Sequence, residues 1–171
     1  APALLKQYPD AESMAAAKPE EIFEYIKSCT YPNNKAKHLS GMSRMLVREF
    51  GGIMPSEPSE LELLPGVGRK TANVVASVYF GKPVMAVDTH VFRVSNRIGL
   101  VKNAKTPLIV EMQLTTHFPA PIIHKAHHWL ILHGRYVCKA RKPLCGECGL
   151  NGFCKYYSQK RNLTNHNQFL K

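Results

Sequence analysis

The sequence predicts an all-α protein, and three observations carry that prediction. Apolar residues recur at helical spacing along most of the 171 residues. Asp, Ser or Pro stands before many of these stretches, as at the starts of helices, and glycines close several of them. The short apolar run at residues 84–87 is too isolated to make a sheet. The length and the 44% hydrophobic content allow one or two compact domains with an apolar core.

The first predicted helices are marked by their caps. Asp10 can cap the stretch "AESMAAA", and Pro19 with two glutamates begins the helix "PEEIFEYIKS". A long helix is expected from Asn34 to Phe50, ended by the glycines at 51 and 52. Its inner face is predicted to carry Leu39, Met42, Leu46 and Phe50.

Two helices are expected around a glycine turn in the middle of the chain. Ser59, with Glu62 completing a capping box, is predicted to begin the short helix "ELELL". The helix after the turn runs from near Arg69 to about Phe80. Its core positions by spacing are Thr71, Val74, Val75 and Val78.

Three further helices are expected in the second half of the chain. Asp88 is a predicted N-cap of "THVFRVSNRI", which Gly99 closes. The stretches "TPLIVEMQLTTHF" and "PIIHKAHHWLILHGRY" each have a proline near their start. Trp129, Leu130 and Leu132 are predicted core residues, and the histidines between 124 and 133 are interpreted as packed or surface residues. The rest is expected to be cysteine-rich loop and polar tail.

The net charge of +11, from 23 basic and 12 acidic residues, favours a polyanionic partner, most often nucleic acid. A solvated basic surface is the alternative interpretation. No apolar run approaches the about 20 residues that span a bilayer. The first residues lack the pattern of a signal peptide. We therefore expect a soluble, cytoplasmic protein with no membrane partner.

Four of the five cysteines lie in the last fifth of the chain, which indicates a metal site rather than disulfides. Gaps of six, two and five residues separate Cys138, Cys145, Cys148 and Cys154. Four thiolates at one locus suit either tetrahedral zinc or a four-iron cluster, and spacing alone does not decide between them. Cys29 stands apart and is predicted to be a small buried residue.

The stretch "LPGVGRK" predicts a tight turn between two helices. Gly66 and Gly68 permit positive φ and leave no side chain between the backbone and a ligand. The helix that follows exposes free N–H groups, which is a typical phosphate site, although a plain αα-hairpin has the same pattern. Arg69 and the helix dipole both disfavour the charged form of the Lys70 amine, which is what a nucleophilic amine needs. A surface charge is the alternative role for Lys70.

"LPGVGRKTANVV" followed by "AVDTHVFRVSNR" resembles the helix-hairpin-helix DNA glycosylases of the endonuclease III type, and the resemblance covers about Ala3 to Tyr157. It implies that Lys70 is the catalytic nucleophile and Asp88 its partner. The implied reaction removes oxidised pyrimidines from duplex DNA and cleaves the strand by β-elimination through a lysine Schiff base. A monofunctional, adenine-type glycosylase and a non-catalytic DNA-binding iron–sulfur module are the alternatives.

The resemblance also implies a fold and a cofactor. Residues 1–82 would form a helical barrel domain that is incomplete at its N-terminus, because the family has further helices there. Residues 83–171 would form a helical domain with a [4Fe–4S] cluster, because the cysteine spacing matches that of the family. The expected partner is double-stranded DNA with damaged bases or abasic sites, bound by a monomer in a bacterial-type cytoplasm at the nucleoid.

Several residues are expected to contact this DNA. Tyr31 takes the place of a residue that, in the family, wedges into the duplex beside the flipped nucleotide, and an ordinary turn aromatic is the alternative. Lys35 would face phosphates nearby. On the cysteine loop, Lys139, Arg141 and Lys142 would do the same. At the hairpin the expected contacts are Gly66, Gly68 and Arg69.

Overall fold

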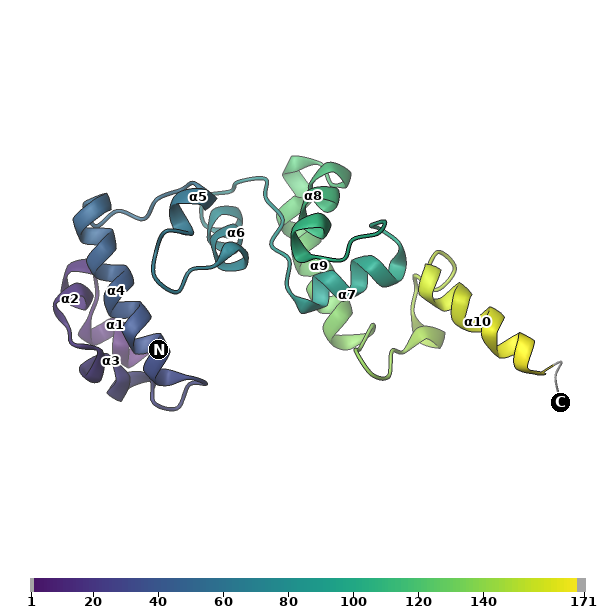
Figure 1. Cartoon of the computed structure of the whole chain (residues 1–171), viewed down its shortest axis with the longest axis horizontal. Helices are drawn as coiled ribbons and strands as arrows, with labels where there is room; N and C mark the ends of the chain where they lie inside the picture. The colour runs from purple at the N-terminus through teal and green to yellow at the C-terminus, as the bar shows by residue number, and fades with distance from the viewer. Residues whose placement is uncertain (1, 169–171) are drawn as a thin grey trace. The chain divides into compact units, whose positions relative to one another are not determined.

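The computed structural model describes residues 2–168, with side chains up to residue 162, and these residues form only helices and loops (Figure 1). The predicted all-α class is therefore confirmed. The chain divides into two compact units, residues 1–76 and 77–171. This division falls six residues before the predicted domain boundary at 82/83, which stays a prediction.

The N-terminal unit contains six helices among its described residues, the last of which reaches two residues into the next unit. They are α1 (Pro2–Gln7), α2 (Ala11–Ala16), α3 (Pro19–Ile26), α4 (Pro32–Phe50), α5 (Pro58–Leu61) and α6 (Arg69–Val78). The predicted cap at Asp10 is confirmed, because its Oδ1 accepts a hydrogen bond from Ser13 N at 2.8 Å. Hydrogen bonds from the Ser13 side chain and backbone lower the pKa of Asp10. Gly51 ends α4 with a φ of 59°, as predicted.

The core of the N-terminal unit lies where α2 and α3 pack against α4. The α4 residues that face this core are mostly small: Ala36, Ser40, Ser43 and Leu46. The predicted face was therefore partly wrong, because only Leu46 of the expected residues is buried. Small side chains let neighbouring helices approach closely, and Leu39 packs against the edge of this core while partly exposed.

Polar groups contribute to this packing between helices. The hydroxyl of Ser40 donates to Ala17 O at 3.2 Å, and Arg44 Nε donates to Ala15 O at 3.0 Å. Both acceptors lie at the C-terminal end of α2, where carbonyls lack helical partners. The two side chains therefore tie the end of α2 to α4.

Two predictions on the helices around the hairpin were wrong. The short helix α5 begins at Pro58 with Glu57 as its N-cap, and not at Ser59, because proline is pre-organised for the first helical position. The buried side of α6 carries Ala72, Asn73, Ala76 and Ser77. Val78, predicted as core, leaves 59% of its surface exposed. The helix thus turns its small residues inward, as α4 does.

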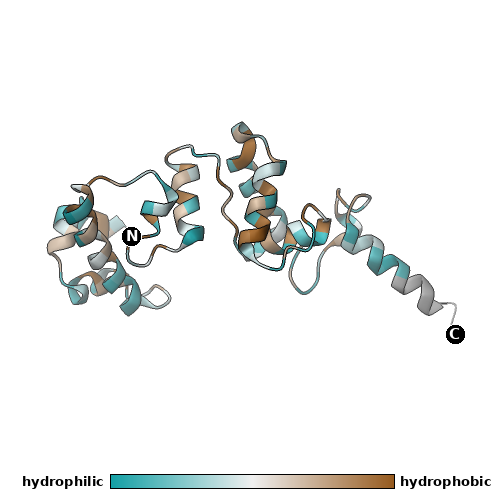
Figure 2. Cartoon of the chain, turned by 45° about the horizontal axis from the view of Figure 1, so that its top comes forward, coloured by the Kyte–Doolittle hydropathy of each residue, from teal (hydrophilic) through white to brown (hydrophobic). Residues whose placement is uncertain are grey.

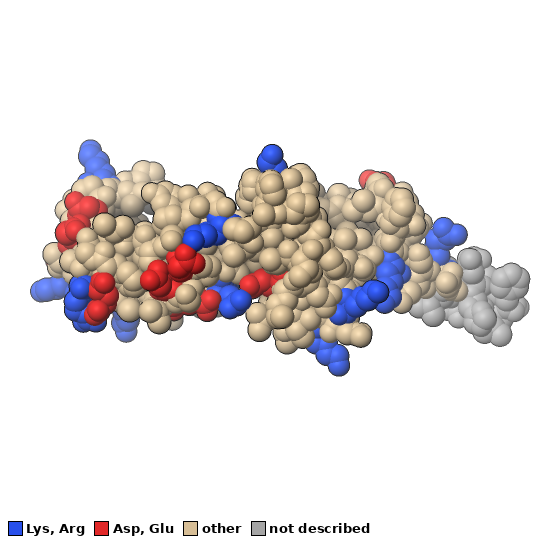
Figure 3. Space-filling view, turned by 90° about the horizontal axis from the view of Figure 1, so that it is seen from above, with Lys and Arg blue, Asp and Glu red and all other residues tan. Residues whose placement is uncertain are grey.

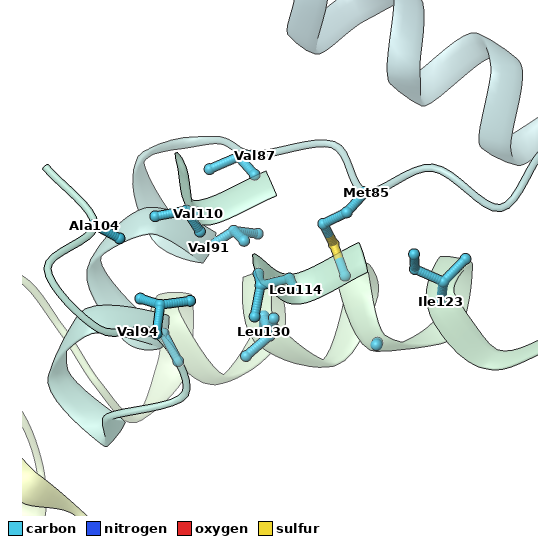
Figure 4. Close-up of a cluster of buried hydrophobic side chains, with 11 residues drawn as sticks. Met85, Val87, Val91, Val94, Ala104, Val110, Leu114, Ile123 and Leu130 are labelled. Carbon is cyan, nitrogen blue, oxygen red and sulfur yellow. The ribbon is translucent and has the colours of Figure 1, made fainter. Parts of the chain in front are cut away.

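The C-terminal unit contains four described α-helices: α7 (Thr89–Ile98), α8 (Pro107–His117), α9 (Ile123–Tyr136) and α10 (Lys155–Gln168). Two short 3₁₀ helices accompany them, Ala120–Ile122 and Cys145–Glu147. In the core, Val91 of α7, Leu114 of α8 and Leu130 of α9 point toward one another (Figure 4). The buried, extended segment Met85–Val87 joins this core and leads directly to Asp88.

Several surface positions differ from prediction. Trp129 and Leu132 of α9 are 55% and 50% exposed, whereas Leu130 between them is buried as expected. Cys29 is exposed and not buried. α10 was not predicted, because its sequence is mostly polar and lacks an apolar period (Figure 2).

None of the helices that the structure describes is long and apolar enough to cross a membrane.

Candidate functional site

Two buried leucines anchor the glycine turn between α5 and α6 to the core of the protein. Leu61 and Leu64 are buried almost completely, and Val67 N donates to Leu64 O at 3.0 Å to close the turn. Gly66 has a φ of +80°, and a Cβ built there would lie 2.7 Å from the His38 side chain on α4. Both the backbone angle and the close approach of His38 therefore require glycine at this position.

Several backbone N–H groups of the turn have no backbone acceptor. Thr71 N and Ala72 N donate to Gly68 O at 2.8 and 3.0 Å, which starts α6. Within the described hairpin, the N–H groups of Gly66, Gly68 and Lys70 donate to no backbone carbonyl. Open amides at a helix start attract phosphate through hydrogen bonds and the helix dipole.

Lys70 is the second residue of α6 and its side chain is exposed. Arg69 lies beside it, and its Nη1 is 3.5 Å from Glu62 Oε1 on the other arm of the hairpin. Glu62 therefore partly compensates the charge of Arg69. The arrangement presents a primary amine next to the open amides.

A groove beside the hairpin brings two of the predicted DNA contacts together. Lys35 and His38 of α4 line it on one side, and Gly66 and Thr71 line it on the other. Its floor is apolar and includes Ile26, Leu39, Met42 and Val67. A phosphate at the hairpin amides would therefore lie near the Lys35 ammonium group.

Tyr31 stands at the N-cap of α4 in a left-handed conformation, with a φ of 56°, and its side chain is 75% exposed. A non-glycine residue in this region carries backbone strain of about 1–3 kcal/mol, which proteins tend to keep at functional sites. Lys35 N donates to Tyr31 O at 3.2 Å, which ties the tyrosine to the first turn of the helix. The backbone of Tyr31 is thus tied to α4, and its ring is open to solvent.

Asp88 is the N-cap of α7, as predicted, and its Oδ1 accepts a hydrogen bond from Val91 N at 2.7 Å. The carboxylate is half-buried at a depression lined by Val87, Thr89, Phe92 and Pro107. Asp88 belongs to the C-terminal unit, whereas Lys70 belongs to the N-terminal unit.

The four clustered cysteines line one cavity in the C-terminal unit. Cys138, Cys145, Cys148 and Cys154 are half-buried free thiols, and the remaining walls are largely apolar. His133 also lines the cavity, with its Nε2 3.8 Å from Cys148 Sγ, and burial lowers the pKa of this imidazole.

This donor set fits an iron–sulfur cluster. In the described part of the chain, no three His, Cys, Asp or Glu side chains form a group that could hold a metal ion. Four thiols around a common apolar cavity match the all-cysteine ligation of a four-iron cluster, which is larger than a single ion.

Two arginines that sequence reasoning missed hold the cysteine segment against α7. Arg93 Nε donates to Cys138 O at 3.1 Å, and its Nη2 donates to Gly134 O at 2.8 Å. Arg97 donates to Lys139 O and Ala140 O, both at 2.8 Å. Their four-residue spacing, which puts both side chains on one face of a helix, was the only sequence signal.

The basic residues of the cysteine segment are accessible. Lys139, Arg141 and Lys142 are all exposed and follow Cys138 within four residues. Basic atoms lie over both units in Figure 3, whereas acidic atoms lie mostly on the N-terminal unit, so that few acidic atoms accompany the basic ones on the C-terminal unit. The segment therefore offers a cluster of cations to a polyanion.

Comparison with protein families gives two matches. Residues 1–120 match the model of the HhH-GPD superfamily of base excision DNA repair proteins. Residues 138–154, which contain all four clustered cysteines, match the iron–sulfur binding domain of endonuclease III.

Individual relatives agree with these families. The chain is 48% identical over 154 residues to endonuclease III of Rickettsia conorii, covering 90% of this chain and 73% of the relative. It is 45% identical over 159 residues to endonuclease III of Escherichia coli K12, covering 90% and 74%. A solved structure of a trapped covalent endonuclease III–DNA intermediate matches with a TM-score of 0.85 and 40% identity, covering 92% of this chain and 74% of that one.

Proposed function

The chain belongs to the HhH-GPD superfamily of base excision DNA repair proteins, and we propose that Lys70 and Asp88 carry its catalysis. It is a DNA glycosylase with AP lyase activity, it binds DNA, and it carries a [4Fe–4S] cluster. The predicted enzyme class and cofactor are thereby confirmed. The roles of single residues and the bases removed are part of the proposal.

Lys70 is the proposed nucleophile. Its amine attacks the anomeric carbon of the damaged nucleotide, and the base departs with its bonding electron pair. The sugar ring opens to a Schiff base, and β-elimination then expels the 3′ phosphate. The observation that carries the proposal is an exposed amine at the start of α6, beside open amides that can bind the neighbouring phosphate.

Asp88 is proposed to stabilise the positive charge that develops at the anomeric carbon and to move protons during base loss. The hydrogen bond from Val91 N holds the Asp88 carboxylate in place, and the surface depression gives a sugar room to approach it. Because the damaged nucleotide is unreachable inside the base stack, the reaction requires that it is flipped out of the duplex.

The proposed substrate is duplex DNA with an oxidised pyrimidine or an abasic site, bound by a monomer in the cytoplasm at the nucleoid. Tyr31 is proposed to enter the gap left by the flipped nucleotide, since its ring is exposed and its backbone is tied to the start of α4. Gly66, Gly68, Arg69 and Lys35 are proposed to bind phosphates at the groove. Lys139, Arg141 and Lys142 add phosphate contacts from the other unit.

Cys138, Cys145, Cys148 and Cys154 are the proposed cluster ligands. When bound, the cluster cross-links the segment from residue 138 to 154. The protein's own part is to keep these thiols around one apolar cavity and to present the adjacent cations on its surface. The cysteine segment thus serves DNA binding, while Lys70 and Asp88 serve the reaction.

The test is borohydride trapping on duplexes that carry one thymine glycol or one abasic site. The chain should cleave both, and borohydride should convert the Schiff base to a stable protein–DNA adduct. Lys70→Ala should lose cleavage and trapping by at least about 10³-fold. Lys6→Ala, which removes an exposed lysine on α1, should leave both unchanged.

Other outcomes would identify the alternatives. Base release without a trapped adduct would indicate a monofunctional glycosylase. An adduct that survives Lys70→Ala would move the nucleophile elsewhere. A non-catalytic module would be indicated if neither the wild type nor Lys70→Ala cleaves DNA and both bind it equally well in an iron-dependent way.

A further inference from the structure

Arg97 binds the backbone of the cysteine segment, residues 138–154, through both terminal nitrogens of its guanidinium group. Its Nη1 and Nη2 donate to two successive carbonyls, Lys139 O and Ala140 O, each at 2.8 Å. Nη1 also lies 3.5 Å from Cys138 Sγ. A planar, forked cation can hold two carbonyls at once, whereas a lysine ammonium group on a flexible stem cannot fix the same geometry.

The same residue contacts the far end of the segment. The guanidinium group lies 4.7 Å from the centre of the Tyr156 ring, within the range of a cation–π contact. The thiol of Cys154 lies 3.5 Å from Arg97 O. Arg97 therefore touches residues next to the first and the last of the four cysteines.

Arg93 makes a different contact, one turn earlier on α7. It bonds Cys138 O and Gly134 O, so it joins the start of the segment to the end of α9. None of the hydrogen bonds that Arg93 makes in the described structure reaches the residues around Cys154. Arg97 is thus the one of the two that joins both ends of the cysteine segment.

We propose that Arg97 is a positioning residue that draws the cysteine segment into a closed loop, so that its first and last thiols meet before the cluster is assembled. The loop between Cys138 and Cys154 contains only one 3₁₀ turn, so closing it costs chain entropy that the arginine contacts offset. This inference rests on the proposed ligation of the cluster by the four cysteines.

The position of Arg97 has a second consequence for the loaded protein. A donor at Cys138 Sγ stabilises added negative charge on the sulfur, and hydrogen bonds to ligating sulfurs are one of the protein's means of setting a cluster's reduction potential. Removing the donor should therefore lower the reduction potential, an effect that a purely structural role would not produce.

The experiment compares the holoprotein with Arg97→Lys, which keeps the charge and removes the fork. Both are purified with their iron, and the loss of visible cluster absorbance is followed in excess chelator. Arg97→Lys should lose the cluster about 10–100-fold faster, the usual cost of removing a residue that supports metal ligands. Its reduction potential, measured by voltammetry on the same samples, should be lower than that of the wild type.

Arg135→Lys is the matched control, because Arg135 lies on α9 in the same unit and is exposed. Its guanidinium group is 5.8 Å from the Tyr136 ring, away from the cysteine segment's carbonyls. This variant should lose the cluster at the wild-type rate. Equal acceleration by both variants would overturn the inference, because any lost arginine would then have the same effect.

Further outcomes separate this inference from the proposal on which it rests. A wild-type protein without iron and sulfide would contradict cysteine ligation. If the wild type contains its cluster, and Arg97→Lys has the same rate of cluster loss and the same reduction potential, only the role of Arg97 is contradicted. If Arg97→Lys does not fold, Tyr156→Leu decides the matter: it should accelerate loss severalfold, and wild-type retention would overturn the inference.

Discussion

The two compact units differ sharply in charge. Residues 1–76 contain nine basic and nine acidic residues, whereas residues 77–171 contain fourteen basic and three acidic ones. The whole excess of +11 therefore belongs to the second unit. The first unit offers phosphate the open amides of a hairpin, and the second offers exposed cations of the cysteine segment. Under the proposed function, backbone geometry in one unit and net charge in the other would bind the same polyanion, so the two contributions can be separated by their salt dependence.

The largest effect is expected from removing the cations of the second unit. Replacing Lys139, Arg141 and Lys142 together by glutamine should reduce the slope of log affinity against log salt by about 2.7, since each phosphate contact contributes about 0.9. At about 0.1 M salt this corresponds to a loss of a few hundredfold in affinity. Fluorescence anisotropy with a labelled duplex at several salt concentrations measures both quantities.

The control removes the same number of charges elsewhere in the unit. Lys102, Lys105 and Lys125 are exposed and lie outside the cysteine segment. Their joint replacement by glutamine should change the salt slope by less than about one. A slope as low as that of the first variant would mean that the charge of the unit acts as a diffuse field and not at one surface.

An intermediate effect is expected at the hairpin. Gly66→Ala forces a side chain into a φ of +80° and against His38, which should lower the free energy of unfolding by at least about 1–2 kcal/mol. The distorted cradle should weaken DNA affinity by about tenfold, roughly 1.4 kcal/mol. The salt slope should stay unchanged, because no cation is removed. Urea denaturation and the anisotropy titration measure these effects.

Gly68→Ala separates binding from folding. A Cβ at Gly68 would meet no atom within 4 Å, so the free energy of unfolding should change by less than about 0.5 kcal/mol. The added methyl group would nevertheless stand between the backbone and a phosphate, and affinity should fall. Wild-type affinity in this variant would contradict phosphate binding by the hairpin amides.

The smallest effects are expected from two buried serines, one in each unit. Ser40 donates to Ala17 O, so Ser40→Ala should lower the free energy of unfolding by about 1 kcal/mol. Ser95 is fully buried, and its Oγ has no hydrogen-bond partner in the described structure. Ser95→Ala should therefore raise the free energy of unfolding by up to about 1 kcal/mol.

Thermal and urea denaturation of the holoprotein compares the two serine variants with the wild type. The two changes in the free energy of unfolding should have opposite signs, although each substitution removes one serine hydroxyl group. This difference in sign is what the comparison tests. A destabilised Ser95→Ala would show that this hydroxyl group has a favourable interaction in solution.

Local signals account for what the sequence predicted correctly. The caps at Asp10 and Asp88 and the glycine end of α4 depend on residues within one helical turn, and all three are confirmed. The inward faces of α4 and α6 depend on which helix lies opposite, which no local pattern contains. The apolar spacing therefore predicted large buried residues, whereas the residues that are buried are mostly small, such as Ala36 and Ala72.

The same limit applies to the candidate site. The chemistry of Lys70, Asp88 and the four cysteines was apparent from short motifs, and their roles stay predictions until tested. Arg93 and Arg97 were missed because their bonding partners lie about forty residues further along the chain. A helical arginine pair is common on solvent-facing surfaces, so its spacing alone could not identify what it binds.

In the second unit, the buried, non-helical segment Met85–Val87 lies among helices. Nδ1 of the buried His127 donates to Ala86 O at 2.8 Å and thus takes the place of a rung in a β-ladder. This bond ties α9 to the segment that leads into Asp88, two residues later. The loop before the Asp88 cap is therefore anchored by a side chain 41 residues further along the chain, so that a substitution of His127 would disturb the approach to Asp88 without touching the carboxylate itself.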